Sequence, residues 1–229
     1  SKMKTYFETI KVCISILLLT MALQSSSETI FVGGLLEESE VWTKDNIYVV
    51  YQDLVVPGGV SLSIEAGVLV KINYAMGIIV DDGAIEVDGS ISDSVSFVPN
   101  HSNPGQTWKW SGLIIRNANE ENKSYLKYAR FLDAETAIKI EDSWSVTIEN
   151  SSIFSCQNLG VNIVNSNSCY LVNCKIENNY DGIEILAAYL NSSSNNVVYN
   201  CIIRNQNHNI YIFREQGGSC RNNLIFRNL

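Results

Sequence analysis

The stretch 171–186, "LVNCKIENNYDGIEIL", decides the fold because its pattern recurs on both sides. The stretches 147–164, "TIENSSIFSCQNLGVNIV", and 198–213, "VYNCIIRNQNHNIYIF", show the same order of residue types. In each stretch an Asn is followed three residues later by an Ile, and then by two apolar residues that flank one variable residue. Self-similarity of this kind is typical of repeat proteins, in which each repeat packs against its neighbours. The pattern therefore indicates a chain built from repeated coils.

Three columns of equivalent residues make the period measurable. The first column holds the inward pairs Ile138/Ile140, Val161/Ile163, Ile183/Ile185 and Ile210/Ile212. The second column holds Phe131, Ile153, Ile176, Ile203 and Ile225. The third column holds Asn150, Asn173, Asn200 and Asn222. Successive inward pairs are offset by 23, 22 and 27 residues, so one coil is about 22–27 residues long.

An all-β, right-handed parallel β-helix explains these columns. Coils stacked about 4.8 Å apart place equal positions directly above one another, so that the Ile columns form a continuous core. An Asn at a tight corner tolerates left-handed backbone angles, and stacked Asn side chains hydrogen-bond along their column. The longest offset predicts an inserted loop over residues 187–196. Leucine-rich repeats are disfavoured because their leucine consensus is absent, and a β-sandwich would not keep three columns in register.

Short alternating segments extend the pattern toward the N-terminus. Strands are predicted at Val60–Ile64, Val68–Ile72, Ile78–Val80, Ala84–Val87 and Val95–Val98. Strands this short, with turns this close, suit a chain that turns a corner every few residues. We assign residues 1–27 to a signal peptide, 28–46 to an N-terminal cap or lead-in, and 47–229 to the β-helix. Because the last residues stop midway through a coil, we expect the β-helix to be truncated at the C-terminus.

Residues 1–27 have the layout of a secretory signal peptide. Lysines at positions 2, 4 and 11 lead into an apolar run, Val12–Leu23, and small residues follow at Ser25–Ser27. The run has about 12 residues, fewer than the roughly 20 that span a bilayer. An uncleaved anchor is the alternative. We expect a secreted or cell-surface protein with no transmembrane segment after cleavage.

Charge and cysteine content narrow the possible partners. The formal net charge of −8 and the pI near 4.8 argue against nucleic acid and anionic membranes, because no basic patch could neutralise phosphates. The cysteines match no zinc spacing. Cys174 and Cys201 occupy equivalent positions in adjacent coils, where stacked free thiols or a disulfide are both open; parallel Cβ vectors favour free thiols.

A family resemblance rests on three stretches of the first half. They are "DLVVPGGVSLSIEAGVLVKI" (53–72), "GIIVDDGAIEVDGSISDSVSFV" (77–98) and "WKWSGLII" (108–115). Together they resemble the N-terminal coils of secreted bacterial right-handed parallel β-helix repeat proteins of the pectin-lyase-like superfamily. The resemblance covers residues 47–229 and implies the fold. It leaves the activity open, since that superfamily includes polysaccharide lyases, glycoside hydrolases and adhesins.

The columns also predict which side chains share one outer surface. The outward residues between the inward pairs are Lys139, Asn162, Glu184 and Tyr211. Just before the pairs, Asp181 aligns with His208 of the next coil. We expect Asp181, Glu184, His208 and Tyr211 to form a patch about one coil spacing across. An aromatic ring, carboxylates and an imidazole suit a sugar ring; a solvated face with an incidental aromatic column is the alternative.

Trp108 and Trp110, in "TWKWSG", are further candidates for carbohydrate binding. Their indole rings could form a platform for a sugar ring. The alternative is that they pack at a corner of the coil.

Catalysis is the second hypothesis, with Asp181, Glu184 and His208 as candidate catalytic residues. Glycoside hydrolysis needs two carboxyl groups about 5–5.5 Å or 6.5–9.5 Å apart. Glu184 and Glu141 lie two coils apart, at about 12 Å, which is too wide. A calcium-dependent lyase would need converging acidic ligands and a basic proton acceptor. We expect no metal and no cofactor, with Ca²⁺ entering only if the chain is a lyase.

The sequence favours an exported β-helix domain with a structural or carbohydrate-binding role. Its expected partner is a polysaccharide or a cell-surface glycan. The alternative is a polysaccharide lyase or glycoside hydrolase whose site is completed by further C-terminal coils. A protein-binding adhesin is the third possibility.

Overall fold

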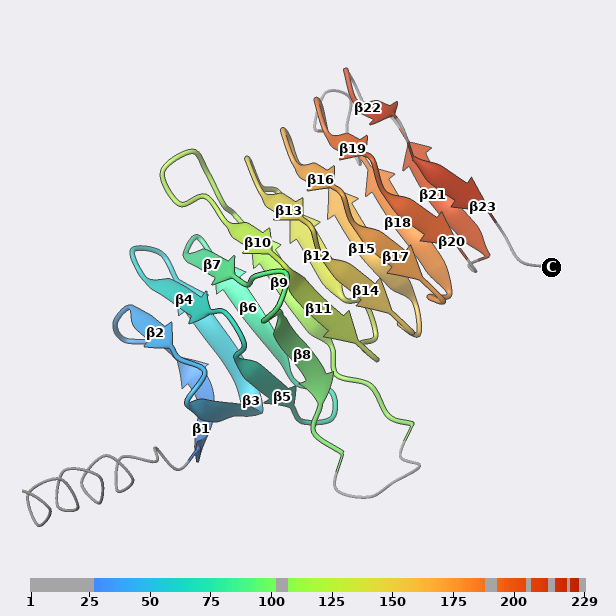
Figure 1. Ribbon diagram of the computed structural model, residues 1–229. Coiled ribbons are helices and arrows are strands. Elements are labelled where there is room, and N and C mark those ends of the chain that lie inside the picture. The colour runs from blue at the N-terminus through green and yellow to red at the C-terminus, as the bar shows by residue number, and fades with distance from the viewer. Residues whose placement is uncertain are drawn as a thin grey trace, which may run out of the picture.

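The computed structural model describes residues 27–101, 107–187, 193–204, 207–213, 217–221 and 223–226. In this part of the chain every regular element is a strand, and the strands wind into a parallel β-helix of about eight turns (Figure 1). The predicted signal peptide lies outside the described residues, apart from Ser27. Within the described ranges, no helix is long and apolar enough to cross a bilayer.

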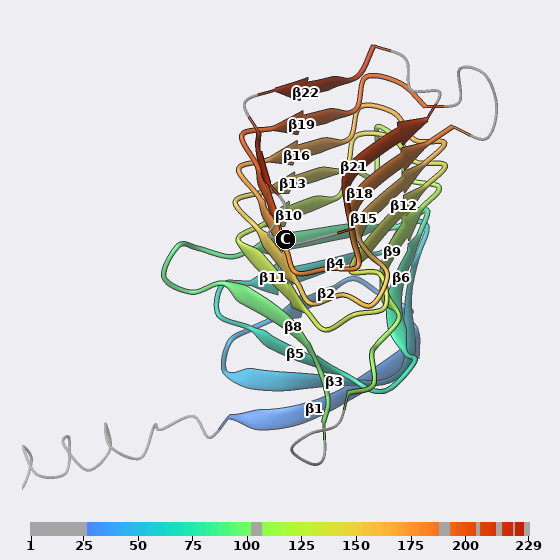
Figure 2. The ribbon, with the colours of Figure 1, turned by 90° about the vertical axis from the view of Figure 1, so that its right-hand side faces the viewer.

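From β4 to β21, each coil contributes one strand to each of three faces (Figure 2). Face 1 consists of β2 (Glu40–Trp42), β4 (Ser61–Glu65), β7 (Ala84–Asp88), β10 (Tyr125–Lys127), β13 (Thr147–Glu149), β16 (Tyr170–Val172), β19 (Val197–Tyr199) and β22 (Ser219–Arg221). Face 2 consists of β5 (Leu69–Ile72), β8 (Val95–Pro99), β11 (Ala129–Leu132), β14 (Ser152–Phe154), β17 (Lys175–Glu177), β20 (Ile202–Arg204) and β23 (Leu224–Phe226). Face 3 consists of β6 (Gly77–Asp81), β9 (Gly112–Arg116), β12 (Ile138–Glu141), β15 (Leu159–Val164), β18 (Asp181–Leu186) and β21 (His208–Phe213).

Two long strands form the N-terminal end of the stack. The first half of β3 (Asn46–Pro57) pairs with β5 and its second half with β6, so this strand belongs to faces 2 and 3. β1 (Glu28–Leu35) pairs in parallel with β3, and β2 pairs with β4. The range 28–46, expected as a cap or lead-in, therefore contains two strands that extend the sheets of the β-helix.

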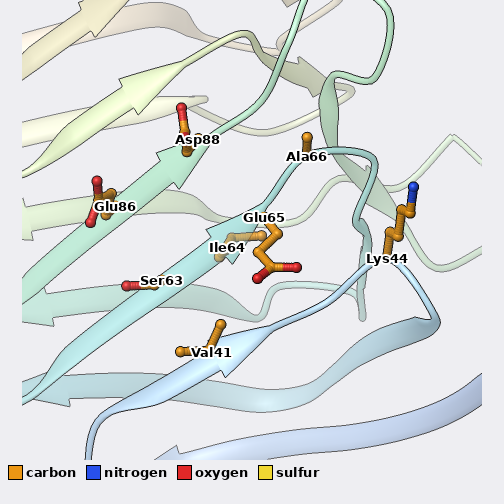
Figure 3. A pocket seen from close by; sticks show the side chains of 8 residues that line it. All are labelled: Val41, Lys44, Ser63, Ile64, Glu65, Ala66, Glu86 and Asp88. Atoms are coloured by element: carbon orange, nitrogen blue, oxygen red, sulfur yellow. The ribbon is translucent and has the colours of Figure 1, made fainter.

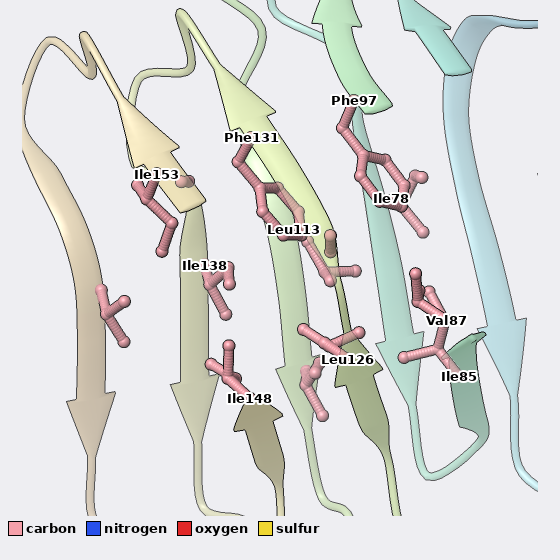
Figure 4. Close-up of a cluster of buried hydrophobic side chains, with 14 of the residues drawn as sticks. Ile78, Ile85, Val87, Phe97, Leu113, Leu126, Phe131, Ile138, Ile148 and Ile153 are labelled. Atoms are coloured by element: carbon pink, nitrogen blue, oxygen red, sulfur yellow. The ribbon is translucent and has the colours of Figure 1, made fainter. Parts of the chain in front are cut away.

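The pairing register confirms the predicted columns. On face 3, Ile138 lies opposite Val161, which is followed in register by Ile183 and Ile210. On face 2 the second column runs from Phe131 to Ile225 in the same way. These side chains are buried through most of the stack and form one continuous core with the inward residues of face 1 (Figure 4). In the most C-terminal described coils, Ile212 and Ile225 are exposed.

The asparagine corners also match the prediction. Asn150, Asn173 and Asn200 have φ values of 50°, 55° and 51°, in the left-handed region. The side-chain amide of Asn173 donates to Asn150 Oδ1 at 3.3 Å, and that of Asn200 donates to Asn173 Oδ1 at 2.7 Å. The fourth predicted member, Asn222, lies outside the described residues. The column is therefore a hydrogen-bonded ladder between face 1 and face 2.

Inward polar side chains satisfy backbone donors where the chain turns. Ser151 Oγ accepts the backbone N–H of Ala129 in the preceding coil at 3.0 Å. Asn179 is only 4 % exposed, and its Oδ1 accepts the backbone N–H of Cys156 in the preceding coil at 2.9 Å. A buried N–H without a partner costs free energy, so each such side chain joins one coil to the previous one.

The N-terminal half of the core contains most of the large aromatic rings. Phe97 and Phe131 stack in parallel with 4.7 Å between ring centroids, one coil above the other. Trp42 and Tyr48 stack at 4.4 Å. The Phe97–Phe131 stack follows from the same rule that aligns the Ile columns, because residues in equal positions of successive coils become neighbours. Trp42 and Tyr48 instead belong to the consecutive strands β2 and β3.

Candidate functional site

The predicted patch lies on face 3, where β18 and β21 are neighbours. The register places Asp181 opposite His208 and Glu184 opposite Tyr211. These four residues, with Leu159 and Ile183, line one open depression of about 330 Å³. Side chains alternate between the core and the solvent along a strand, so buried Ile183 and Ile185 force Glu184 outward. The expectation that the four residues share a patch is therefore confirmed.

A contact between an imidazole and a carboxylate joins the two coils at one end of the patch. His208 Nδ1 lies 2.9 Å from Asp181 Oδ1, and the backbone N–H of His208 donates to the same oxygen at 3.0 Å. The imidazole is 73 % exposed, so the pair is screened by water and adds little to stability. Its effect is positional, since it fixes the ring beside the start of β18.

Glu184 occupies the less accessible part of the patch. Burial, and then the negative charge of Asp181, raise the pKa of Glu184 above its ordinary value. The two carboxylates belong to the same strand and lie close enough to repel each other. Tyr211, one coil above Glu184, has half of its surface exposed and offers a ring to solvent.

The other two residues of the predicted outward column lie below the patch. Asn162 pairs in register with Glu184, and Lys139 pairs with Asn162. Neither lines the depression. Lys139 Nζ forms an ion pair with Glu141 at 2.5 Å within its own strand. Asn162 Oδ1 is buried without a hydrogen-bond partner among the described atoms.

The two tryptophans have different environments. Trp110 is fully buried and its indole N–H donates to the backbone oxygen of Leu132 at 2.9 Å. It therefore offers no ring face to a ligand, which corrects the expectation that it helps form a platform. Trp108 is partly exposed and makes edge contacts with Tyr74 and His101 at 5.7 and 4.7 Å between ring centroids. Neither tryptophan lines the patch on face 3.

Leu159 is the member of the depression that the sequence reading did not single out. It lies opposite Asp181 in the register, one coil below it. The signal was present in the column alignment, since Leu159 precedes the pair Val161/Ile163 by the same two residues as Asp181 precedes Ile183. Its apolar side chain adds a hydrophobic surface beside the carboxylate and the imidazole.

The patch contains carboxylates and one imidazole but no converging ligand set. Among the residues that the structure describes, no three His, Cys, Asp or Glu side chains gather closely enough to hold a metal ion. Cys156, Cys169, Cys174 and Cys201 are buried thiols that form no disulfide. The backbone N–H of Cys174 donates to Cys201 Sγ at 3.4 Å, so the stacked thiols take part in the corner hydrogen bonds.

Comparison with protein families identifies the architecture. A family model described as a right handed beta helix region matches residues 77–229, and the chain belongs to this family. The solenoid is therefore right-handed, as the sequence predicts. Searches of curated proteins and of solved structures returned no match.

Proposed function

We propose that the chain is an exported β-helix domain that binds a polysaccharide through the patch on face 3. The observation that carries this proposal is the half-exposed ring of Tyr211, set in register beside Glu184 and within one depression with Asp181 and His208. Aromatic rings pack against apolar ring faces. Carboxylate oxygens and imidazole nitrogens supply the hydrogen-bond partners that sugar hydroxyl groups need.

The shape of the site agrees with a polymer better than with a small enclosed ligand. The depression is open and lies on a sheet face that continues through neighbouring coils. A glycan chain could lie across several coils while one sugar unit contacts Tyr211. Export rests on the sequence of residues 1–27. N-terminal sequencing of the protein secreted by an expression host would test it, and a protein that keeps these residues and stays in the cytoplasm would contradict export.

Binding is tested with a glycan array and with Tyr211→Ala as the diagnostic variant. Loss of an aromatic contact worth about 0.5–1.5 kcal/mol should weaken glycan binding by up to about tenfold. Tyr51→Ala is the matched control, because Tyr51 is also half exposed but lies in β3 outside the depression. Absence of glycan binding, or equal binding by the Tyr211→Ala variant, would reject the proposal. Binding to proteins alone would favour the adhesin.

A polysaccharide lyase or glycoside hydrolase is the second candidate. One observation favours it: the pKa of Glu184 is raised by burial and by Asp181, and a general acid needs a raised pKa. Release of reducing or unsaturated sugars that disappears in Glu184→Gln would establish catalysis. Binding without release would leave the domain as a binding module.

A further inference from the structure

A groove on face 1 lies outside the patch described above. Two adjoining cavities, of about 530 and about 350 Å³, share Glu86 and Asp88 and so form one groove. Its lining includes residues of β2, β4, β7, β10 and β13, so it runs across the strands along the axis of the solenoid. Four strand spacings give it a length of about 19 Å. Figure 3 shows the N-terminal part of the groove, with Glu86 and Asp88 side by side on β7.

The lining combines hydroxyl groups with an aromatic ring. Ser63, Thr147 and Tyr125 line the groove, and Tyr125 is 45 % exposed. Tyr170 lies in register two coils above Tyr125, with the smaller Thr147 between them. Side chains stand roughly perpendicular to a sheet, so these rings project from face 1. The result is a polar surface on which a sugar ring can contact aromatic side chains.

The groove also carries an excess of negative charge. Its carboxylates are those of Glu65, Glu86, Asp88 and Glu149. None of them forms an ion pair with another described residue, and only Lys44 and Lys127 bring positive charge to the lining. Buried Ile85 and Val87 alternate with Glu86 and Asp88, which therefore point to solvent. A ligand complementary to this groove is positively charged and long.

The backbone of face 1 distinguishes between a basic peptide and a positively charged polysaccharide as the ligand. The strands that form the groove pair with their neighbours on both sides, except β2, and this pairing uses their backbone N–H and C=O groups. An extended peptide would need a strand edge to satisfy its own backbone. Sugar hydroxyl groups need only side-chain partners, which the groove supplies.

We propose that this groove binds a linear polysaccharide with free amino groups, lying along the solenoid axis. The protonated amines lie opposite the carboxylates of Glu86, Asp88 and Glu149, and sugar rings contact Tyr125. The groove is separate from the patch on face 3 and does not depend on the function proposed for it.

The test is isothermal titration calorimetry at low salt with two ligands of equal length. A fully deacetylated glucosamine hexamer should bind, and its fully N-acetylated counterpart should bind at least about tenfold more weakly, since it lacks the charges. The double variant Glu86→Gln/Asp88→Asn should lose about tenfold in affinity for the amino hexamer.

Two controls isolate the groove. The double variant Glu28→Gln/Glu135→Gln removes the same charge outside the groove lining and should bind as the unmodified protein does. Tyr51→Ala, which lies outside both the groove and the patch on face 3, should also leave binding unchanged. Because the variant Glu86→Gln/Asp88→Asn keeps Tyr211, a loss of binding in it is distinguishable from failure of the patch on face 3. Circular dichroism verifies that each variant folds.

Three results would overturn the proposal: equal binding of the acetylated hexamer, unchanged binding by the groove variant, or a hexalysine peptide that binds more tightly than the amino hexamer. The last result would assign the groove to basic peptides instead.

Discussion

At the residue scale, the corner asparagines show why this sequence repeats. Asn173 has a left-handed backbone, and its side chain joins Asn150 below to Asn200 above. Left-handed angles cost most residues roughly 1–2 kcal/mol, whereas Gly and Asn adopt them routinely. The repeated Asn is therefore explained by the backbone and the ladder, without any ligand.

Replacing Asn173 separates these two contributions. Asn173→Ala should lower the free energy of unfolding by about 1–2 kcal/mol. Ala is disfavoured at left-handed backbone angles, and it cannot form the side-chain hydrogen bonds of the ladder. Asn173→Gly should retain more stability, since it loses only two exposed side-chain hydrogen bonds. Urea denaturation measures both. Both variants lose the ladder, so a Gly variant no more stable than the Ala variant would contradict the backbone cost assigned to this position.

Glu184 predicts a pH dependence of stability. Its raised pKa means that the folded state disfavours the charged form, so the group costs stability as the pH rises above the ordinary carboxyl value of about 4.3. Glu184→Gln should therefore raise the melting temperature at neutral pH. Below both pKa values the side chain is neutral in both states, and the difference should vanish. If the variant and the unmodified protein differ in melting temperature by the same amount at acid and neutral pH, the raised pKa of Glu184 is not the cause of the difference.

At the element scale, most strands and their register could be predicted from the sequence, because stacking forces similar residue types into equal positions. The pairings of Asp181 with His208 and of Glu184 with Tyr211 follow from the same alignment. The corner hydrogen bonds could not be predicted, since one column changes from Ser151 to Cys174 while keeping its inward position. The buried position of Trp110 depends on how the corner before β9 packs, which periodicity does not encode.

Asn179 tests the corner hydrogen bonds. Asn179→Ala removes the acceptor for the backbone N–H of Cys156 and should cost about 1–3 kcal/mol, because that buried donor is left without a partner. Asn158→Ala is the control, since Asn158 is exposed and its amide donates only to Glu135, at 3.3 Å. Chemical denaturation should separate the two variants. Equal losses of stability in the two variants would show that the hydrogen bond between Asn179 and Cys156 is not the cause of the loss.

At the scale of the whole molecule, each coil is stabilised by the coils directly above and below it. The core extends along the whole stack, and the free energy of unfolding is approximately a sum of contributions from neighbouring coils. Buried groups along the stack are therefore protected only while their own coil stays docked. The four described thiols lie in the C-terminal half of the stack and report on this protection.

A Cys13→Ser/Cys220→Ser variant isolates these four thiols. Burial raises the pKa of Cys156 to about 12. The hydrogen bond with Cys201, together with burial, raises the pKa of Cys174 well above the ordinary thiol value. Because all four thiols are buried in the folded state, the native variant should react very slowly with a thiol reagent, and urea should make all four reactive. Reaction of only two would indicate a disulfide, and rapid reaction of the native protein would contradict the burial.

The pairing of every face along a single axis also gives the molecule a mechanical direction. The hydrogen bonds between successive coils point along the solenoid, so tension applied to the two ends of the chain loads the bonds of one terminal coil before those of the next. We expect such a protein to unfold under tension one coil at a time, beginning at an end of the stack. Each event releases one coil of about 22–27 residues, and a stretching trace should show a series of small, nearly equal steps.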